Sequence, residues 1–382
     1  MMSRRVVIVG AGLAGSRCAQ TLRTEGFEGQ ICLVGEEPHP PYERPALSKE
    51  FLAGTREELL LQRPTVWGDL AIDLELGVRV ERIDATRRIA STSRGDLEWD
   101  ALVLATGARA RRPAAFGGSG VHVLRTLDDA RRLRAELVPG RRLAIVGSGF
   151  VGTEVASTAI DLGVDVTIVD LATLPFERTL GPEIGRLLAD RYREHGVDLR
   201  LGAGVERVLR RGDGTLRGLR LSNGTELEHD LVLVAVGAEP AGELLRGAPG
   251  PIGTDEGGRT CLPDVYACGD VAAPWSAAHS RHVRFEHWTS AAGQAAAVAR
   301  AVLGTQPGAR PTPYFWSDQF GLRLQHVGSA EGWERIVLDG HESSLVARYV
   351  AQDGRLVAAL LVNRPHQVGS LRRELAPKLL AA

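Results

Sequence analysis

Two glycine-rich segments carry the clearest chemistry in this sequence. Residues 10–15 read GAGLAG and residues 147–152 read GSGFVG, so both have the spacing Gly-x-Gly-x-x-Gly. At this spacing the first glycine permits a tight turn, the second lets a diphosphate approach the backbone, and the third lets a helix pack closely on a strand. The sequence therefore predicts two dinucleotide sites. The residues assigned to them are Gly10, Gly12, Leu13, Ala14, Gly15, Gly147, Gly149, Phe150, Val151 and Gly152.

An acidic residue follows each motif at the distance at which it can bind a ribose. Glu36, with Glu37 as a competitor, follows the first motif, and Asp170 follows the second. An acid there accepts a hydrogen bond from the ribose 2′-hydroxyl. Because residues 171–173 offer no arginine for a 2′-phosphate, we expect the second site to prefer NADH over NADPH. The alternative for Asp170 is a solvated acid at the end of a strand.

Each glycine motif lies inside a strand–helix–strand unit. An apolar strand runs into each motif, helices are expected over residues 13–25 and 151–162, and apolar strands follow over residues 30–34 and 166–169. Apolar strands without alternation are typical of parallel sheets covered on both faces. The expected fold class is therefore α/β, with two Rossmann-like dinucleotide-binding domains. Two such sites in one chain indicate one bound flavin and one exchanging nicotinamide.

A second repeated pattern follows each unit, where an apolar strand ends at a glycine. It reads ALVLATGA over residues 101–108 and LVLVAVGA over residues 231–238. After residue 304 a proline-rich segment leads to residues 314–382, whose strand-like stretches and final helix, near residues 367–375, indicate a small α+β domain.

Composition excludes several functional classes. The 382 residues include 46 basic and 47 acidic side chains, a balance that argues against a nucleic-acid binder held by a broad basic face. Without a run of 18 apolar residues or a signal-peptide pattern, we expect no membrane span. The four cysteines show no Cys-x-x-Cys spacing, which favours reduced thiols and a cytoplasmic protein. The ten histidines form no zinc motif, so no metal is expected.

Five longer motifs identify a resemblance that runs over essentially the whole chain. They are PYERPALSK (residues 41–49), GFVGTE (149–154), YACGD (266–270), EHW (286–288) and PYFWSDQ (313–319). On these motifs the chain resembles the FAD-dependent ferredoxin and rubredoxin reductases that serve cytochromes P450 and ring-hydroxylating dioxygenases. That family often has RPPLSK, and Ala46 replaces the second proline here.

The resemblance implies a domain order and a set of flavin contacts. An FAD domain, residues 1–110 and 241–310, would be interrupted by an NAD domain, residues 111–240, and followed by a C-terminal domain, residues 311–382. Asp270 would hydrogen-bond the ribitol chain; its alternative role is that of a turn residue. The further cofactor-binding residues implied are Arg44, Ala105, Thr106, Gly107, Gly237, Glu286, His287, Trp288 and Trp316.

The helix expected over residues 289–303 has a similar implied role. Thr289 or Ser290 is expected to cap it, so that its positive end stabilises the negative charge of reduced flavin. Trp288, and less firmly Trp316, would flank the isoalloxazine ring; the alternative for each is a core or interface aromatic.

Lys49 and Glu154 form the expected catalytic pair. In the family the loop that contains Lys49 approaches flavin N5, and Glu154 lies in the helix after the second glycine motif. An ion pair beside N5 would orient the nicotinamide carboxamide, and a compact ammonium suits N5 better than the fork of an arginine. Only two of the 46 basic residues are lysine, the other being Lys378. The alternative is that both side chains are solvated.

The expected reaction is that of an NADH-dependent ferredoxin reductase. A hydride passes from NADH to flavin N5, and single electrons then pass to a small, acidic iron–sulfur ferredoxin that feeds an oxygenase such as a cytochrome P450. Arg281, Arg284 and Arg310 are candidates for a basic docking rim on a monomer or weak dimer. Because residues 38–52 contain no cysteine, a thiol relay is not expected. The alternatives are a flavin NADH oxidase or quinone reductase, and a redox-sensing interaction protein like apoptosis-inducing factor.

Overall fold

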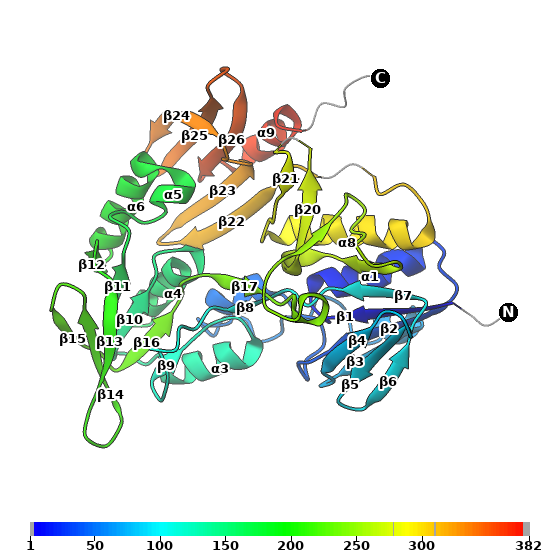
Figure 1. Ribbon diagram of the computed structural model, residues 1–382. Coiled ribbons are helices and arrows are strands. Elements are labelled where there is room, and N and C mark those ends of the chain that lie inside the picture. Colours follow the sequence, from blue (N-terminus) through cyan, green and yellow to red (C-terminus); the bar gives the residue numbers. More distant parts are fainter. Residues whose placement is uncertain (1–3, 278, 309–310, 377–382) are drawn as a thin grey trace. The chain divides into compact units, whose positions relative to one another are not determined.

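The structure is a computed structural model that describes residues 4–277, 279–308 and 311–376 (Figure 1). The chain forms two compact units. The described residues of Met1–Glu43, Leu60–Arg109 and Glu239–Tyr314 make the first, and those of Arg44–Leu59, Ala110–Ala238 and Phe315–Ala382 make the second. Among the described residues no helix is long and apolar enough to cross a membrane.

A parallel five-stranded sheet forms the centre of the first unit. Its strand order is β19-β7-β1-β2-β3, and every pair of neighbours is parallel. The apolar run of the first strand is buried throughout, as expected for a sheet covered on both faces. The strands are β1 (Arg5–Val9), β2 (Gln30–Gly35), β3 (Ile72–Leu76), β7 (Ala101–Leu104) and β19 (Val265–Ala267).

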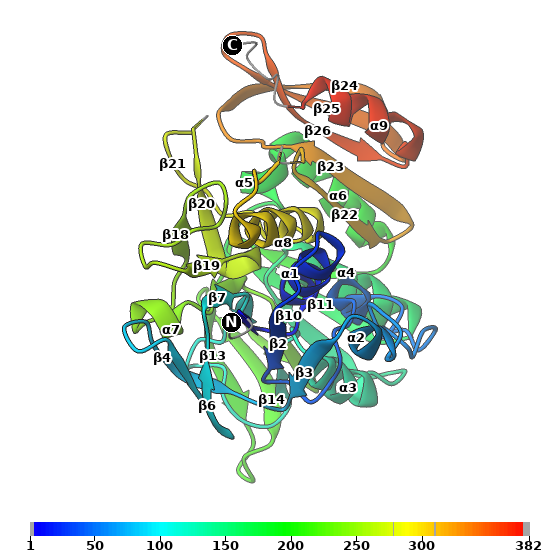
Figure 2. The same ribbon diagram turned by 90° about the vertical axis from the view of Figure 1, so that its right-hand side faces the viewer.

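Two helices rich in small residues cover one face of this sheet. α1 (Leu13–Thr24) and α8 (Trp288–Leu303) lie side by side, as Figure 2 shows, and share a core with the strands. Their alanines allow this close approach because they add little bulk between the helices. The opposite face packs on Trp99, Val80 and neighbouring residues. The smaller elements of this unit are α2 (Val66–Asp69), β4 (Val80–Asp84), β5 (Ile89–Thr92), β6 (Gly95–Glu98), α7 (Glu243–Arg246), β18 (Ile252–Thr254), η2 (Gly269–Val271), β20 (Ala272–Ser276) and β21 (Arg281–His282).

The second unit repeats the parallel architecture. Its sheet has the order β12-β11-β10-β16-β9, with all neighbours parallel. The strands are β9 (Val121–His122), β10 (Arg142–Val146), β11 (Asp165–Asp170), β12 (Asp198–Leu201) and β16 (Leu231–Val234). The remaining elements of residues 110–238 are α3 (Leu127–Glu136), α4 (Phe150–Asp161), α5 (Glu177–Leu180), α6 (Pro182–Glu194), β13 (Val205–Arg210), β14 (Leu216–Leu221) and β15 (Glu226–Glu228). Short strands β8 (Ala108–Ala110) and β17 (Ala238–Pro240) pair where the chain passes between units.

The C-terminal part is a five-stranded sheet of order β22-β23-β26-β25-β24, in which β23 pairs antiparallel with β26, β26 with β25 and β25 with β24. The α/β fold class with a small C-terminal domain, expected from the sequence, is confirmed by this topology. The elements are β22 (Tyr314–Gln319), β23 (Leu322–Gly328), β24 (Trp333–His341), β25 (Ser344–Ala351), β26 (Leu356–Val362), η3 (Pro365–Gln367) and α9 (Val368–Glu374).

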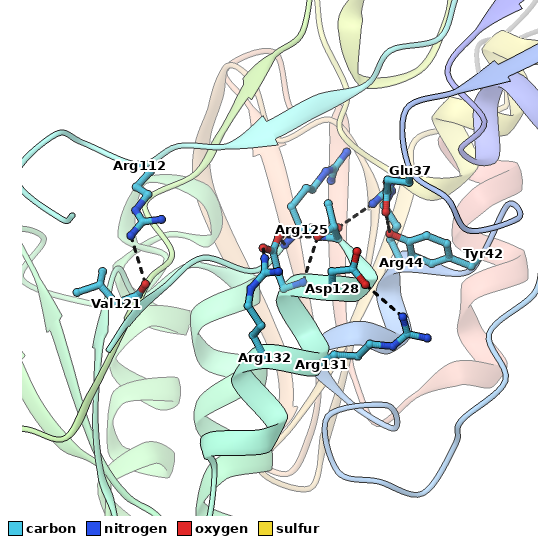
Figure 3. Close-up of polar contacts among 11 residues, drawn as sticks. Glu37, Tyr42, Arg44, Arg112, Val121, Arg125, Asp128, Arg131 and Arg132 are labelled. Atoms are coloured by element: carbon cyan, nitrogen blue, oxygen red, sulfur yellow. Dashed lines mark hydrogen bonds and ion pairs between the residues drawn. The ribbon is translucent and has the colours of Figure 1, made fainter. Parts of the chain in front are cut away.

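The start of α3 holds the segment that contains Lys49. A capping box begins the helix: Thr126 Oγ1 accepts from the Asp129 N–H at 3.1 Å, and the Asp129 carboxylate accepts from the Thr126 N–H at 3.0 Å. The Arg44 guanidinium, at the start of η1 (Arg44–Ser48), donates to the Arg125 carbonyl at 2.8 Å (Figure 3). The capped helix therefore anchors the beginning of this segment.

Replacing Thr126 with alanine should lower the free energy of unfolding by about 1 kcal/mol, because the Asp129 N–H loses its acceptor. Urea denaturation measures the change. Thr126→Ser keeps the hydroxyl acceptor and serves as the control, so an equal loss in both variants would contradict the capping role.

Candidate functional site

The two glycine motifs have the same local geometry. A Cβ on the first glycine would lie 2.2 Å from the Ala105 carbonyl oxygen at Gly10, and 2.5 Å from the Ala235 carbonyl oxygen at Gly147. Both of these glycines also have positive φ angles, +113° and +107°. The first glycine of each motif thus occupies a backbone conformation and a space that other residues do not tolerate.

The second and third glycines of each motif have different structural roles. A Cβ on Gly15 would lie 1.9 Å from the Gly10 oxygen and a Cβ on Gly152 would lie 2.3 Å from the Gly147 oxygen, so the third glycine makes close packing possible. A Cβ on Gly12 or Gly149 would meet nothing within 4 Å. These second glycines cap α1 and α4, whose first turns contain no acidic residue. An open backbone at a helix N-terminus fits a diphosphate in both units.

The acids expected to bind ribose differ in their surroundings. The Glu36 side chain is 60% exposed, with Arg79 Nε 3.8 Å from its carboxylate, whereas Glu37 accepts from the Tyr42 hydroxyl at 2.7 Å (Figure 3). Asp170 accepts from the backbone N–H and the hydroxyl of Ser148, both at 2.6 Å. Ser148 therefore fixes the Asp170 carboxylate beside the second glycine motif, at the end of β11.

Two glycine turns complete the candidate flavin site in the first unit. Thr106 Oγ1 donates to the Ala241 carbonyl at 2.6 Å, and the Gly107 carbonyl accepts from the Ala241 N–H at 3.0 Å. Asp270 lies in η2, whose Gly269 has φ +78° and would bring a Cβ within 2.9 Å of Ala14 Cβ. The Asp270 turn thus lies against the first turn of α1.

The expected cap of the alanine-rich helix was wrong. α8 begins at Trp288 with His287 as its N-cap residue, and Thr289 donates its hydroxyl to the Tyr314 carbonyl at 2.7 Å instead of capping. Burial lowers the pKa of His287 to about 4, against a smaller upward effect of Asp270. The imidazole at this helix start is therefore neutral at pH 7. Glu286 pairs with Arg284, and Trp288 is half-buried.

Lys49 and Glu154 form a buried ion pair within the second unit. Lys49 Nζ lies 2.7 Å from Glu154 Oε2, and the two side chains are 12% and 6% exposed. Lys49 also donates to the Pro45 carbonyl at 3.0 Å. Isolated buried charges are costly, so the mutual pairing and the added hydrogen bonds offset the desolvation of both groups. The alternative that both side chains are solvated is wrong.

Two serines at this pair were not predicted. The Ser48 hydroxyl donates to Glu154 Oε2 at 2.5 Å, and the Ser317 hydroxyl donates to Glu154 Oε1 at 2.6 Å. Both lie inside motifs that indicated the family resemblance, beside Lys49 and the half-buried Trp316. Their presence in those motifs was the available signal, although nothing in the sequence places either serine next to Glu154.

Comparison with known families identifies the chain. A pyridine nucleotide-disulphide oxidoreductase model matches residues 4–295, and a reductase C-terminal model matches residues 314–379. The chain belongs to the pyridine nucleotide-disulphide oxidoreductase family. It is an oxidoreductase, and its two glycine cradles fit the FAD and NADH that this family uses.

Within this family, the chain is similar to several ferredoxin reductases of oxygenase systems. The chain is 39% identical to the ferredoxin–NAD(+) reductase component of the biphenyl dioxygenase system of Paraburkholderia xenovorans strain LB400, over 94% of this chain and 90% of that protein. It is 38% identical, over the same shares, to the ferredoxin reductase subunit of a 5,5′-dehydrodivanillate O-demethylase from a Sphingobium species. The crystal structure of the covalent putidaredoxin reductase–putidaredoxin complex matches with a TM-score of 0.94 and 35% identity, over 98% of this chain and 93% of that one. The resemblance stated from the motifs is confirmed.

Three of the four thiols lie in surroundings that disfavour the reactive thiolate form. All four cysteines are free, and Cys18, Cys32 and Cys268 are buried. Burial raises the pKa of Cys32 to about 11 and that of Cys268 to about 12, so neither forms a thiolate near neutral pH.

Two alanine substitutions in the second motif should affect different properties, stability in one variant and NADH binding in the other. Gly152→Ala should lower the free energy of unfolding by about 1–3 kcal/mol, because its Cβ would collide with the Gly147 carbonyl. Gly149→Ala should leave stability unchanged but weaken NADH binding about tenfold, since its methyl group occupies the open face of the turn. Thermal unfolding and NADH titration measure both. Unaltered NADH binding in Gly149→Ala would contradict the assignment of this turn to the cofactor.

Proposed function

We propose that this chain is an NADH-dependent ferredoxin reductase that supplies an oxygenase with electrons through a small iron–sulfur ferredoxin. Two relatives that are 38% and 39% identical to the chain are named as ferredoxin reductases of oxygenase systems, and one similar structure contains the partner putidaredoxin. We place the protein in the cytoplasm because its cysteines are free thiols and most of them are buried.

FAD, when bound, supplies the chemistry that joins the two-electron oxidation of NADH to one-electron transfer. We assign its diphosphate to Gly10, Gly12 and Gly15 and its ribitol to Asp270. The other residues assigned to FAD are Leu13, Ala14, Glu36, Arg44, Ala105, Thr106, Gly107, Glu286, His287, Trp288 and Trp316. NADH is assigned to the second motif, with Asp170 at the ribose and Gly237 in the adjoining turn.

The buried ion pair is the observation that carries the proposal. With both cofactors bound, Lys49 would donate to the reactive edge of the flavin and Glu154 would accept from the nicotinamide carboxamide. A surface ion pair would contribute little, but a pair that is almost completely desolvated has a fixed geometry. Its two side chains would therefore orient a bound nicotinamide for transfer.

The alternatives differ from this proposal in the electron acceptor. An NADH oxidase or quinone reductase would pass electrons to oxygen or a quinone, and a redox-sensing interaction protein would keep them. Turnover with oxygen, quinones and a [2Fe–2S] ferredoxin separates the three. The proposal requires that the ferredoxin be reduced fastest.

Lys49→Ala should retain FAD but reduce the rate of flavin reduction by NADH about a hundredfold, because the flavin loses its donor and Glu154 loses the opposite charge that fixes it for the nicotinamide. Stopped-flow absorbance measures this rate. Glu50→Ala, at the exposed neighbouring position, is the matched control and should behave like the wild type. A wild-type rate in Lys49→Ala would remove the lysine from the mechanism.

Ferredoxin reduction should fall steeply with ionic strength, as expected for a basic rim that meets an acidic partner. Arg281 is exposed, Arg284 is partly neutralised by Glu286, and the third candidate, Arg310, lies outside the described residues. Ferredoxin-dependent cytochrome c reduction measures the effect. Reduction of ferricyanide by NADH in the same buffers is the control, and equal salt sensitivity in both assays would refute the docking rim.

A further inference from the structure

Glu154 has hydrogen-bond partners on both carboxylate oxygens, and the two sets come from different parts of the sequence. Glu154 Oε2 lies 2.7 Å from Lys49 Nζ and accepts a hydrogen bond from the Ser48 hydroxyl at 2.5 Å. Glu154 Oε1 accepts a hydrogen bond at 2.6 Å from the hydroxyl of Ser317, which lies in β22 of the C-terminal sheet. Ser317 itself is completely buried. The C-terminal part of the chain thus holds one oxygen of the carboxylate that the proposed function assigns to the nicotinamide.

The Ser317 hydroxyl is the end of a longer chain of hydrogen bonds. Gln319 Nε2 donates to Ser317 Oγ at 3.0 Å, and the Tyr192 hydroxyl donates to Gln319 Oε1 at 2.5 Å. Tyr192 lies in α6 and is fully buried, and Gln319 is 3% exposed. Water has little access to these three side chains, so their hydrogen bonds must be made to neighbouring protein groups.

The charge of Glu154 fixes the direction of every bond in the chain. An ionised carboxylate only accepts, so the single hydroxyl proton of Ser317 must point to Oε1. Ser317 can then only accept from Gln319, which forces the amide to present its NH₂ group to the serine and its oxygen to Tyr192. Burial raises the pKa of the Tyr192 hydroxyl; a side-chain hydrogen bond with Thr153 acts against the rise and the Glu154 charge adds to it, so the tyrosine keeps the proton that it donates.

We propose that Ser317 is a positioning residue for Glu154, and that Gln319 and Tyr192 fix its orientation. The inference rests on the proposed function for the role of Glu154. By occupying Oε1 from a rigid strand, Ser317 holds the carboxylate in the one rotation that keeps Oε2 on Lys49. The C-terminal domain therefore contributes directly to the geometry of NADH oxidation.

Ser317→Ala tests the role through rate and affinity together. The limiting rate of flavin reduction by NADH should fall about tenfold, while the dissociation constant for NADH changes less than about twofold, because only the orientation of the nicotinamide is lost. Ser317→Thr retains the hydroxyl and should restore most of the rate. Tyr192→Phe, which frees the Gln319 amide to turn, should slow reduction by a smaller factor.

Ser157→Ala is the matched control. Ser157 lies one turn along α4 from Glu154, and its hydroxyl accepts from the Phe320 N–H at 2.7 Å without touching the carboxylate. Like Ser317→Ala, this variant removes one serine hydroxyl, which here bonds to the backbone directly after β22. It should keep the wild-type rate of reduction.

Thermal unfolding supplies a readout that needs no turnover. Ser317→Ala should lower the Tm clearly more in the wild-type background than in Glu154→Gln, where the acceptor has lost its charge. Equal Tm losses in both backgrounds, or an unchanged rate in Ser317→Ala of a protein that NADH does reduce, would refute the positioning role alone. A wild-type protein that holds flavin but is not reduced by NADH would instead refute the proposed function.

Discussion

The buried charge of Glu154 is the constraint on which the candidate site depends. Burying a carboxylate until 6% of its side chain is exposed is costly unless donors replace the water it has lost. Lys49 supplies the opposite charge, and the Ser48 and Ser317 hydroxyls supply two further hydrogen bonds. Removing any one partner leaves a charge or a polar group unsatisfied, so the site tolerates little rearrangement.

The fold explains how these partners meet. α4 begins at the second glycine motif, which places Glu154 within the first two turns of the helix. The capped start of α3 holds Arg44, at the beginning of the segment that leads to Lys49, and the Thr158 hydroxyl of α4 donates to the Ser48 carbonyl at 2.9 Å. The C-terminal sheet then adds Ser317. Three segments that are distant in sequence therefore converge on one carboxylate. The glycine turns that suit the dinucleotides depend on local geometry and on one close approach each, of Gly10 to Ala105 and of Gly147 to Ala235.

The sequence predicted the parts of the fold that depend on local chemistry. Glycine spacing and apolar runs placed the helix at residues 13–25, and it spans Leu13–Thr24. They also placed a parallel strand on each side of it. The prediction of the α8 cap failed because Thr289 and Ser290 are both suitable caps by type, yet Thr289 is engaged by the Tyr314 carbonyl, 25 residues away. The short antiparallel sheets β4-β5-β6 and β13-β14-β15 were not predicted, since strands of three to six residues leave a weak pattern.

The candidate site shows the same difference between residues recognisable from local sequence and contacts that only folding creates. Lys49 was recognisable because lysine is so rare in this chain, but its contact with Glu154 spans more than a hundred residues and is created only by folding.

The most direct test of the central claim is an anaerobic titration of the purified protein with NADH, followed by oxidised [2Fe–2S] ferredoxin. The account predicts a yellow protein whose flavin absorbance is bleached by NADH, more readily than by NADPH, and recovers when the ferredoxin is added. A colourless protein, or a reduced flavin that recovers only in oxygen, would contradict it.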